Sequence, residues 1–503
     1  MTLSVKERDW MSRVIKEDEI RRYMQGDTDF IDDEEIWSKL LSNRNPDRKW
    51  IEDILQKSLA VETLTPDETA ALLNVEDPEL WDEMFRVAGE VKKKVYDNRI
   101  VTFAPLYCSN YCVNNCLYCG FRRENLKEKR RRLTLEEVKE EVSVLAGEIG
   151  HKRLIVVYGE HPLSDARYIA DTIEAIYSVK VPTRNGLGQI RRVNVNAAPM
   201  SIEDLRMLRD VGIGTYQVFQ ETYNHDLYAK VHPKGTIKHD YRWRLYCMHR
   251  ALEAGIDDVA IGVLFGLYDW RFEVMGLLYH ARELERQFDG IGPHTISFPR
   301  LMPAAEAPFV QETRYKVSDE DFKKIITVLR LAVPYTGLIL TARERAEVRR
   351  EVMPLGITQT DASTKIGIGA YSDGSENQEI DRQQFIIGDP RSLDEVIREL
   401  AEMGYITSFC TAGYRCGRTG DRIMKLLRSG KEGKFCKLNA ILTFREWLDD
   451  FASEETKKVG EKVIESEIEE VKAGIPDNYP QAVFDELLKY YERIKNGERD
   501  LYF

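Results

Sequence analysis

The chain has 503 residues, 43% of them apolar, and a formal net charge of −12 at pH 7. A chain of this length buries a large core and forms either one big domain with appendages or two or three domains. Its negative charge excludes a general attraction for nucleic acid or anionic lipid, so we expect small molecules or other proteins as its partners.

The N-terminal segment MTLSVKERDWMSRVIKEDEI carries charges where a signal peptide needs an apolar stretch. No segment approaches the ~18 apolar residues of a membrane span, so we expect a cytoplasmic protein without a membrane partner. Clustered cysteines in a reducing compartment indicate metal ligands rather than disulfides. Six of the eight cysteines fall in two regions, 112–119 and 410–436.

The predicted elements begin with residues 1–98, where charged and apolar residues recur at helical spacing, as in TPDETAALLNVEDPELWDEMFRVAGEVKKKVY. We interpret this segment as a helical leader that covers one end of the next domain. Nothing in it resembles a metal or nucleotide motif.

Residues 99–364 alternate strand-like runs with helical patterns. The helical patterns have start signals such as the capping-box spacing of Thr134 and Glu137. Eight strands alternating with helices predict an α/β fold, a (β/α)8 TIM barrel, with a doubly wound open sheet as the alternative. The eight runs are 99–107, 153–160, 191–198, 214–221, 258–266, 294–301, 337–344 and 356–363.

Residues 365–503 start with a polar stretch, GAYSDGSENQEIDRQQ, and continue as helical segments. Three further cysteines, Cys410, Cys416 and Cys436, lie in this part of the chain. We expect a separate, mostly helical C-terminal domain that binds metal.

The octapeptide CVNNCLYC places Cys112, Cys116 and Cys119 directly after the first predicted strand. In a barrel the chemistry lies at the C-terminal ends of the strands, where Gly159-Glu160 and Arg343 also lie. A structural zinc site needs four protein ligands, whereas three thiolates in one loop fit a 4Fe-4S cluster with one open iron. A structural or electron-transfer protein that binds zinc or a fully ligated cluster is the alternative from another class.

The loop resembles the signature of the radical S-adenosylmethionine (SAM) enzymes, C-x3-C-x-aromatic-C after the first barrel strand. The resemblance implies that the three cysteines hold the SAM-binding 4Fe-4S cluster. It also implies that Tyr118 lies beside the adenine and that Gly159-Glu160 holds the methionine amino group. Tyr158 stands where the family usually has a small residue.

Nearly the whole chain is similar to the tyrosine lyases of iron-iron hydrogenase maturation, through FAPLYCSNYCVNNCLYCG, RRVNVNAA, FQETY, GPHTISFPRL, AVPYTGLIL and CTAGYRCGRTGDR. The related lyases of thiazole synthesis lack the late cysteines. The resemblance implies cleavage of the Cα–Cβ bond of L-tyrosine to p-cresol and dehydroglycine (2-iminoacetate), and conversion of dehydroglycine to carbon monoxide and cyanide on a second cluster. Its implied partners are L-tyrosine, SAM, an electron donor such as ferredoxin or flavodoxin, and hydrogenase maturation proteins. Arg343 is our candidate cation for the tyrosine carboxylate.

The second cluster of the family uses C-x2-C-x22-C, which corresponds here to Cys410, Gly413 and Cys436. Because Gly413 and Gly417 are flexible, we expect Cys416 to replace the missing thiolate through a shifted loop. The alternative is an incomplete cluster and a lyase that stops at dehydroglycine. The resemblance also assigns His294 to an additional iron beside the second cluster.

Asp361 is a further departure, because the family has small and hydroxyl residues there, and it could change the barrel mouth. We interpret the basic stretch RRENLKEKRRR (122–132) as a solvated loop rather than a polyanion site, because Glu124 and Glu128 interleave with its basic residues. Cys108 and Cys247 are expected to be thiols without a ligand role.

Overall fold

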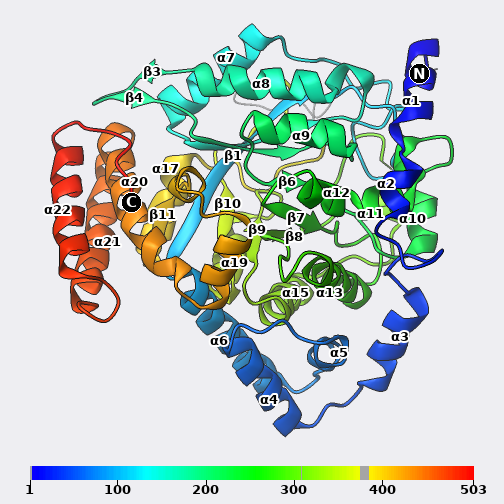
Figure 1. Cartoon of the computed structure of the whole chain (residues 1–503), viewed down its shortest axis with the longest axis horizontal. Helices are drawn as coiled ribbons and strands as arrows, with labels where there is room; N and C mark the ends of the chain where they lie inside the picture. The colour runs from blue at the N-terminus through cyan, green and yellow to red at the C-terminus, as the bar shows by residue number, and fades with distance from the viewer. Residues whose placement is uncertain (1–2, 308, 374–383) are drawn as a thin grey trace.

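The computed structural model describes residues 3–307, 309–373 and 384–503. Part of the predicted polar stretch, 374–383, lies outside the described residues. The central feature of the structure is a sheet of parallel strands in the order β10-β9-β8-β7-β6-β5-β2-β1. The sheet closes into a barrel because β10 also pairs with β1 (Figure 1). The strands are β1 (Arg99–Ser109), β2 (Arg153–Tyr158), β5 (Arg192–Asn196), β6 (Tyr216–Gln217), β7 (Val259–Gly262), β8 (Thr295–Ser297), β9 (Gly337–Leu340) and β10 (Gln359–Asp361).

Closure of the barrel is set by the register of its first and last strands, in which Val101 faces Gln359 and Phe103 faces Asp361. The predicted TIM barrel is therefore confirmed, and the open sheet is wrong. Except for β1, which extends two residues beyond its predicted run, the strands are shorter than the predicted runs, because residues at the strand ends leave the ladder and enter the loops. A small antiparallel hairpin, β3 (Val181–Pro182) with β4 (Leu187–Gly188), lies outside the barrel.

Helices surround the barrel, and their apolar faces pack on the strands. The capping box of Thr134 and Glu137 starts α7, and Ser201 and Ser318 cap α9 and α15. These helices are α7 (Leu135–Ser143), α8 (Ala166–Ser178), α9 (Ile202–Asp210), α10 (His225–Val231), α11 (Tyr241–Leu245), α12 (Cys247–Glu253), α13 (Trp270–Gln287), α14 (Phe309–Glu312), α15 (Asp319–Ala332) and α16 (Ala346–Val352).

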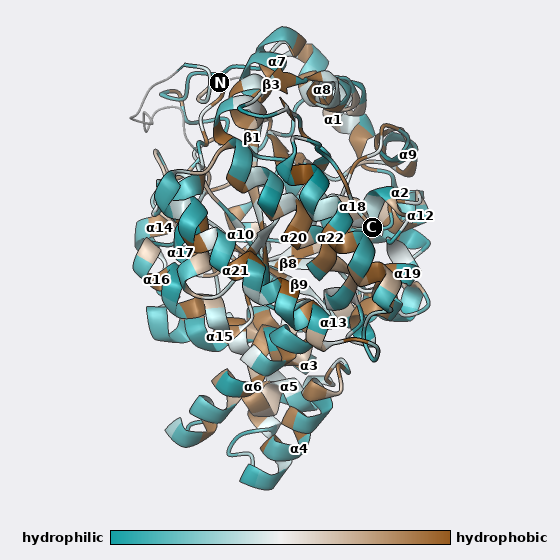
Figure 2. Ribbon diagram, turned by 90° about the vertical axis from the view of Figure 1, so that its left-hand side faces the viewer, coloured by the Kyte–Doolittle hydropathy of each residue, from teal (hydrophilic) through white to brown (hydrophobic). Residues whose placement is uncertain are grey.

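The N-terminal segment is helical, as predicted, and divides into two parts in Figure 1. Helices α1 (Val5–Val14) and α2 (Glu17–Arg21) lie at the right of the view, beside α10 and α11. Helices α3 (Asp33–Ser42), α4 (Arg48–Leu59), α5 (Pro66–Leu73) and α6 (Pro78–Tyr96) lie along the lower edge, and α6 packs on α15. Figure 2 shows that α4 to α6 project from one end of the molecule.

The C-terminal segment is mostly helical, and its strand β11 joins the barrel sheet. Strand β11 (Ile406–Ser408) runs parallel to β1 and pairs Ile406 with Arg99. The helices are α17 (Leu393–Glu402), α18 (Ala412–Arg415), α19 (Gly420–Arg428), α20 (Glu432–Asp450), α21 (Glu454–Ala473) and α22 (Gln481–Lys495). Helix α20 packs on both α21 and α22, which form the outer layer at the left of Figure 1.

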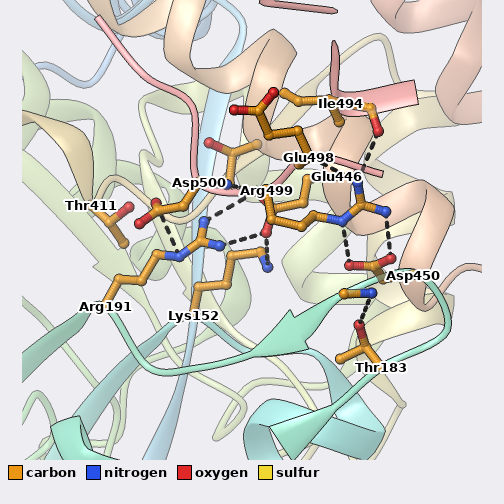
Figure 3. A network of polar contacts seen from close by, with 12 residues as sticks. Lys152, Thr183, Arg191, Thr411, Glu446, Asp450, Ile494, Glu498, Arg499 and Asp500 are labelled. Atoms are coloured by element: carbon orange, nitrogen blue, oxygen red, sulfur yellow. Dashed lines mark hydrogen bonds and ion pairs between the residues drawn. The ribbon is translucent and has the colours of Figure 1, made fainter. Parts of the chain in front are cut away.

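A buried ionic network connects this segment to the barrel (Figure 3). The Glu446 carboxylate of α20 accepts hydrogen bonds from Lys152 (2.7 Å) and Arg191 (2.6 Å), which precede β2 and β5. Burial alone would raise the pKa of Glu446, but the two cations hold the pKa well below its usual value. Removing one member would leave an uncompensated buried charge, at a cost of ~3–5 kcal/mol.

Among the described helices, none is long and apolar enough to cross a lipid bilayer. Cys108 and Cys247 are buried.

Candidate active site

A cavity of about 1510 Å³ opens at the C-terminal ends of the barrel strands. Each strand end contributes to its wall, as expected for a TIM barrel enzyme. The structure brings together here seven predicted site residues, namely Cys112, Cys116, Tyr118, Cys119, Gly159, Glu160 and Arg343.

Backbone contacts hold the three-cysteine loop against the ends of neighbouring elements. The Val113 N–H donates to the Glu160 carbonyl (2.8 Å), and the Leu117 N–H donates to the Val231 carbonyl (3.0 Å). Burial raises the pKa of all three thiols, to about 12 for Cys116, and each thiolate would repel the others. Three such cysteines become stable thiolates only beside a strong positive charge, which is what iron ions supply, so the donor set fits an iron-sulfur cluster.

Gly159 lets the second strand approach the cysteine loop closely. A Cβ atom at this position would lie 3.3 Å from Cys112 Cβ and 3.0 Å from the Tyr111 carbonyl carbon, with the carbonyl oxygen nearer still. The Gly159 N–H donates to the Ser109 carbonyl (2.9 Å), which fixes the strand end. Only glycine allows the next residue, Glu160, to lie beside the three cysteines.

The Glu160 carboxylate is buried and only partly satisfied. Its Oε2 accepts a hydrogen bond from Asn114, whereas Oε1 has no hydrogen-bond partner among the described residues. Burial raises the pKa of Glu160, although Arg244, Asn114 and Lys238 favour the ionised form. A buried carboxylate oxygen without a partner inside a cavity is suited to binding a cationic ligand group.

Tyr118 and Lys238 form another part of the cavity wall. The Tyr118 hydroxyl is 2.8 Å from His232 Nε2, and Lys238 Nζ lies 5.5 Å from the Tyr118 ring centroid. Lys238 also donates to Glu221 (2.8 Å), and Arg244 lies 3.6 Å from the same carboxylate. Despite its burial, these two cations hold the pKa of Glu221 below its usual value.

Arg343 extends into the cavity with its guanidinium over the Phe385 ring, 3.3 Å from the centroid. No acceptor for its guanidinium N–H groups lies within hydrogen-bond distance in the described parts of the chain. Burial lowers the pKa of Arg343, while Tyr107, Glu221 and Cys119 oppose that shift. A half-buried cation whose donors have no acceptor among the described residues is suited to binding a carboxylate.

Asp361 also lines the cavity, but its oxygens have protein partners. The Ala342 N–H donates to Oδ1 (2.7 Å) and the Thr364 hydroxyl to Oδ2 (2.8 Å). Burial raises the pKa of Asp361, against the effect of Arg349. Through the hydrogen bond from Ala342, the Asp361 side chain connects the end of β10 to the loop that follows β9.

Sequence reasoning missed Asn114, Lys238, Arg244 and Gln384 as site residues. Gln384 donates from Nε2 to Cys119 Sγ (3.6 Å) and accepts from the Tyr107 hydroxyl (3.1 Å). Asn114 lies inside the quoted cysteine motif, so its polar side chain was a usable signal. No local signal marked the other three, which reach the cavity from distant loops.

A second cavity, of about 510 Å³, lies at the opposite end of the barrel. Cys410, Cys436, His294 and Gly413 line it, together with Asp258. His294 Nδ1 lies 3.9 Å from Asp258 Oδ1, and both Asp258 oxygens are buried without a hydrogen-bond partner among the described residues.

Cys416 does not line the second cavity. It follows α18, and its thiol donates to the Phe503 carbonyl (3.4 Å). A Cβ atom at Gly413 would have no neighbour nearer than 3.9 Å, so this position has room for a side chain. Within the described residues, no three His, Cys, Asp or Glu side chains are arranged as ligands of a single metal ion.

Comparison with known proteins agrees with this architecture. Residues 106–275 match the family model of the radical SAM superfamily, and residues 297–406 match that of the biotin and thiamin synthesis associated domain. The chain is 30% identical over 355 residues to 2-iminoacetate synthase of Salmonella typhimurium, an alignment that covers 70% of this chain and 88% of that protein.

Two solved structures extend the similarity to the C-terminal segment. A crystal structure of HydG, a maturase of the [FeFe]-hydrogenase, has a TM-score of 0.88 and 48% identity, with 95% of this chain and 100% of that chain covered. HydG from Carboxydothermus hydrogenoformans has a TM-score of 0.74 and 36% identity, with 96% and 99% covered.

A closed parallel barrel with a three-cysteine loop after its first strand and a Gly-Glu pair after its second defines a radical SAM enzyme. The chain belongs to the radical SAM superfamily, in the group that contains 2-iminoacetate synthase and the HydG maturases. The hypothesis of a structural metal-binding protein is therefore wrong.

Proposed function

We propose that the protein is a tyrosine lyase, which uses SAM to break the Cα–Cβ bond of L-tyrosine and releases p-cresol and dehydroglycine. The observation that carries this proposal is one cavity that holds three cysteines together with the Glu160 carboxylate and the Arg343 guanidinium. Among the described residues, one Glu160 oxygen has no hydrogen-bond partner and the guanidinium has no acceptor. Both SAM and tyrosine carry an ammonium and a carboxylate group. The proposal also rests on membership of the group that contains 2-iminoacetate synthase.

Cys112, Cys116 and Cys119 would hold the 4Fe-4S cluster. When bound and reduced, this cluster supplies the electron that splits SAM into methionine and a 5'-deoxyadenosyl radical. Glu160 would accept a hydrogen bond from the methionine ammonium, and Asn114 keeps the carboxylate oriented. Tyr118, fixed by its contact with His232, would border the adenine.

Arg343 would bind the tyrosine carboxylate at the end of β9. Phe385 packs against the guanidinium and limits its motion, which lowers the entropic cost of holding the substrate. The closed barrel keeps water from the reacting centre and fixes the substrate at reacting distance.

The fate of dehydroglycine depends on the second cavity, where Cys410 and Cys436 would bind an auxiliary cluster and His294 an additional iron. The family reaction would yield carbon monoxide and cyanide for hydrogenase assembly. The contact of Cys416 with Phe503, away from that cavity, supports the alternative in which the lyase stops at dehydroglycine.

Anaerobically reconstituted protein with tyrosine, SAM and dithionite tests the first step, and p-cresol is the expected product by chromatography. Intact cluster absorption without p-cresol would contradict the lyase. Carbon monoxide trapped by deoxyhaemoglobin tests the second step. We expect p-cresol without a carbonyl spectrum from the wild type, and a carbonyl spectrum from Gly413→Cys, because a side chain fits there. A carbonyl spectrum from the wild type would contradict the shorter reaction.

A further inference from the structure

Asp361 is an acid in the central cavity, at a position where the resembled family has small and hydroxyl residues. It ends β10, whose Thr360 pairs with Leu340 at the end of β9. The Ala342 N–H, which donates to Asp361 Oδ1 (2.7 Å), belongs to the residue directly before Arg343. The acid and the candidate cation of the substrate site therefore start from adjacent strand ends.

The acids of the cavity have different surroundings. Among the described lining residues, three carry a carboxylate, namely Glu160, Glu221 and Asp361. Glu160 lies in the part of the cavity assigned to SAM, beside the three cysteines. Glu221 is paired with two cations, Lys238 (2.8 Å) and Arg244 (3.6 Å). Asp361 is thus the carboxylate that remains for the ammonium group of a second ligand.

The cations of the cavity also leave one group over. Within the described chain, Lys238, Arg244 and Arg343 line it. The first two pair with Glu221, whereas the Arg343 guanidinium has no acceptor among the described residues. An α-amino acid carries one carboxylate and one ammonium group, so Arg343 and Asp361 match its two charges.

The Asp361 carboxylate has capacity for a further donor. An ionised carboxylate offers about four acceptor sites. The Ala342 N–H contacts Oδ1, and the Thr364 hydroxyl donates to Oδ2 (2.8 Å). Both donors are neutral groups, so neither cancels the charge of the acid.

No cation cancels that charge either. In the part of the chain that the structure describes, no Lys, Arg or His nitrogen lies within ion-pair distance of the Asp361 carboxylate. Burial raises the pKa of Asp361, and Arg349 of α16 opposes that shift. The Arg349 guanidinium itself pairs with Asp389 and donates to the Thr360 hydroxyl (2.6 Å). A buried carboxylate without a paired cation is stabilised by a cationic group that binds beside it.

Arg343 and Asp361 both act on Tyr107, which lines the same cavity. Burial raises the pKa of the Tyr107 hydroxyl, while Arg343 lowers it and Asp361 raises it further. Since such effects weaken with distance, both charges lie near the same part of the cavity wall. The cavity also has the apolar walls that an aromatic side chain needs, among them Phe103, Pro105, Ile339, Ile366 and Phe385.

We propose that Asp361 binds the ammonium group of the substrate while Arg343 binds its carboxylate, so that the pair selects α-amino acids over analogues that lack either charge. This inference rests on the proposed function, because it takes L-tyrosine as the substrate. The alternative is a purely structural role for Asp361 at the end of β10.

The test is anaerobic calorimetry on the full, reconstituted chain, with saturating SAM to fill the Glu160 site and without reductant, so that nothing turns over. Kd is measured for L-tyrosine, for desaminotyrosine, which lacks the ammonium group, and for tyramine, which lacks the carboxylate. Wild type is compared with Asp361→Asn and Arg343→Gln. Asparagine keeps the structural hydrogen bonds, because its amide oxygen accepts from the Ala342 N–H and its NH2 group donates to the Thr364 hydroxyl. This variant therefore removes the charge alone.

We expect Asp361→Asn to bind tyrosine and tyramine at least about tenfold more weakly than wild type. Desaminotyrosine should bind it within about twofold of wild type or more tightly, because the acid no longer repels the ligand carboxylate. Arg343→Gln should weaken tyrosine and desaminotyrosine and spare tyramine. With dithionite present, the KM for tyrosine in p-cresol formation should rise at least about tenfold in Asp361→Asn.

Two results would overturn the proposal, namely wild-type affinity for tyrosine in Asp361→Asn and an equal loss of all three ligands, which would assign Asp361 a structural role. If the variant loses iron, Asp361→Ser, which restores a hydroxyl residue, is measured instead with the same expected pattern. A wild type with the expected binding pattern but no p-cresol would contradict the lyase and still support the Asp361 contact. The two failures are therefore distinguished.

Discussion

Replacing Gly159 by alanine tests whether close approach of β2 to the cysteine loop creates the SAM site. The added Cβ would lie 3.0 Å from the Tyr111 carbonyl carbon and 3.3 Å from Cys112 Cβ, with the Tyr111 carbonyl oxygen nearer still. Relaxed carbon contacts are ~3.5–4.0 Å. The cysteine loop must therefore move by about 1 Å relative to Glu160.

We expect Gly159→Ala to lower both the stability of the protein and the rate of SAM cleavage. Overpacking of a tight contact costs ~1–3 kcal/mol in the free energy of unfolding. A misplacement of about 1 Å between reacting groups lowers the rate by ~10²-fold. We expect the variant to cleave SAM about a hundred times more slowly than wild type, and to bind less iron after reconstitution.

The assays are 5'-deoxyadenosine formation under saturating dithionite, iron content and denaturant unfolding. Gly212→Ala is the control, because its φ of +81° is strained for alanine but no atom lies within 4 Å of the new Cβ, and it lies beyond α9. It should lose ~1–2 kcal/mol of stability and keep the SAM cleavage rate. A Gly159→Ala enzyme with wild-type SAM cleavage and stability would refute the reasoning.

Three further predictions concern single side chains. Glu160→Gln should weaken SAM binding by at least about tenfold, measured by calorimetry, because a neutral amide replaces the free carboxylate oxygen; equal affinity would contradict the assigned contact. Cys416→Ala should leave the iron content unchanged, because its thiol contacts Phe503, whereas a loss of about four irons would make Cys416 a cluster ligand. Burial alone would lower the pKa of His225, but Asp29 and Asp33 raise the pKa to about 9, so the stability from this contact is present below pH ~6.5 and is lost as pH rises through 9. His225→Gln should therefore lower Tm at pH 6 more than at pH 10, and an equal loss at both values would contradict this linkage.

Much of the barrel could be predicted from local pattern. The predicted capping box of Thr134 and Glu137 starts a helix as expected, and each predicted strand run overlaps one observed strand. These features depend on interactions within a few residues, so they are visible in a sequence. The lengths of all strands except β1 were overestimated, because a period of two continues into loop residues that no neighbouring strand pairs with.

Some residues of the candidate site could be predicted from short motifs, and others could not. The spacing of Cys112, Cys116 and Cys119 and the adjacent pair Gly159-Glu160 lie in short motifs, and the structure gathers them around one cavity. Lys238, Arg244 and Gln384 line the same cavity without any local signal, because their position depends on how distant loops return over the barrel mouth. Sequence spacing also could not indicate that Cys416 turns toward Phe503.

The sequence by itself determined the chemistry that is available, since ligand type, spacing and helix or strand period are set by neighbours along the chain. Only the tertiary structure decided that β10 pairs with β1 to close the barrel, that β11 adds to β1 from outside, and which charged groups keep free donors or acceptors. Closure and pairing depend on contacts between residues hundreds of positions apart, whose geometry no local pattern encodes.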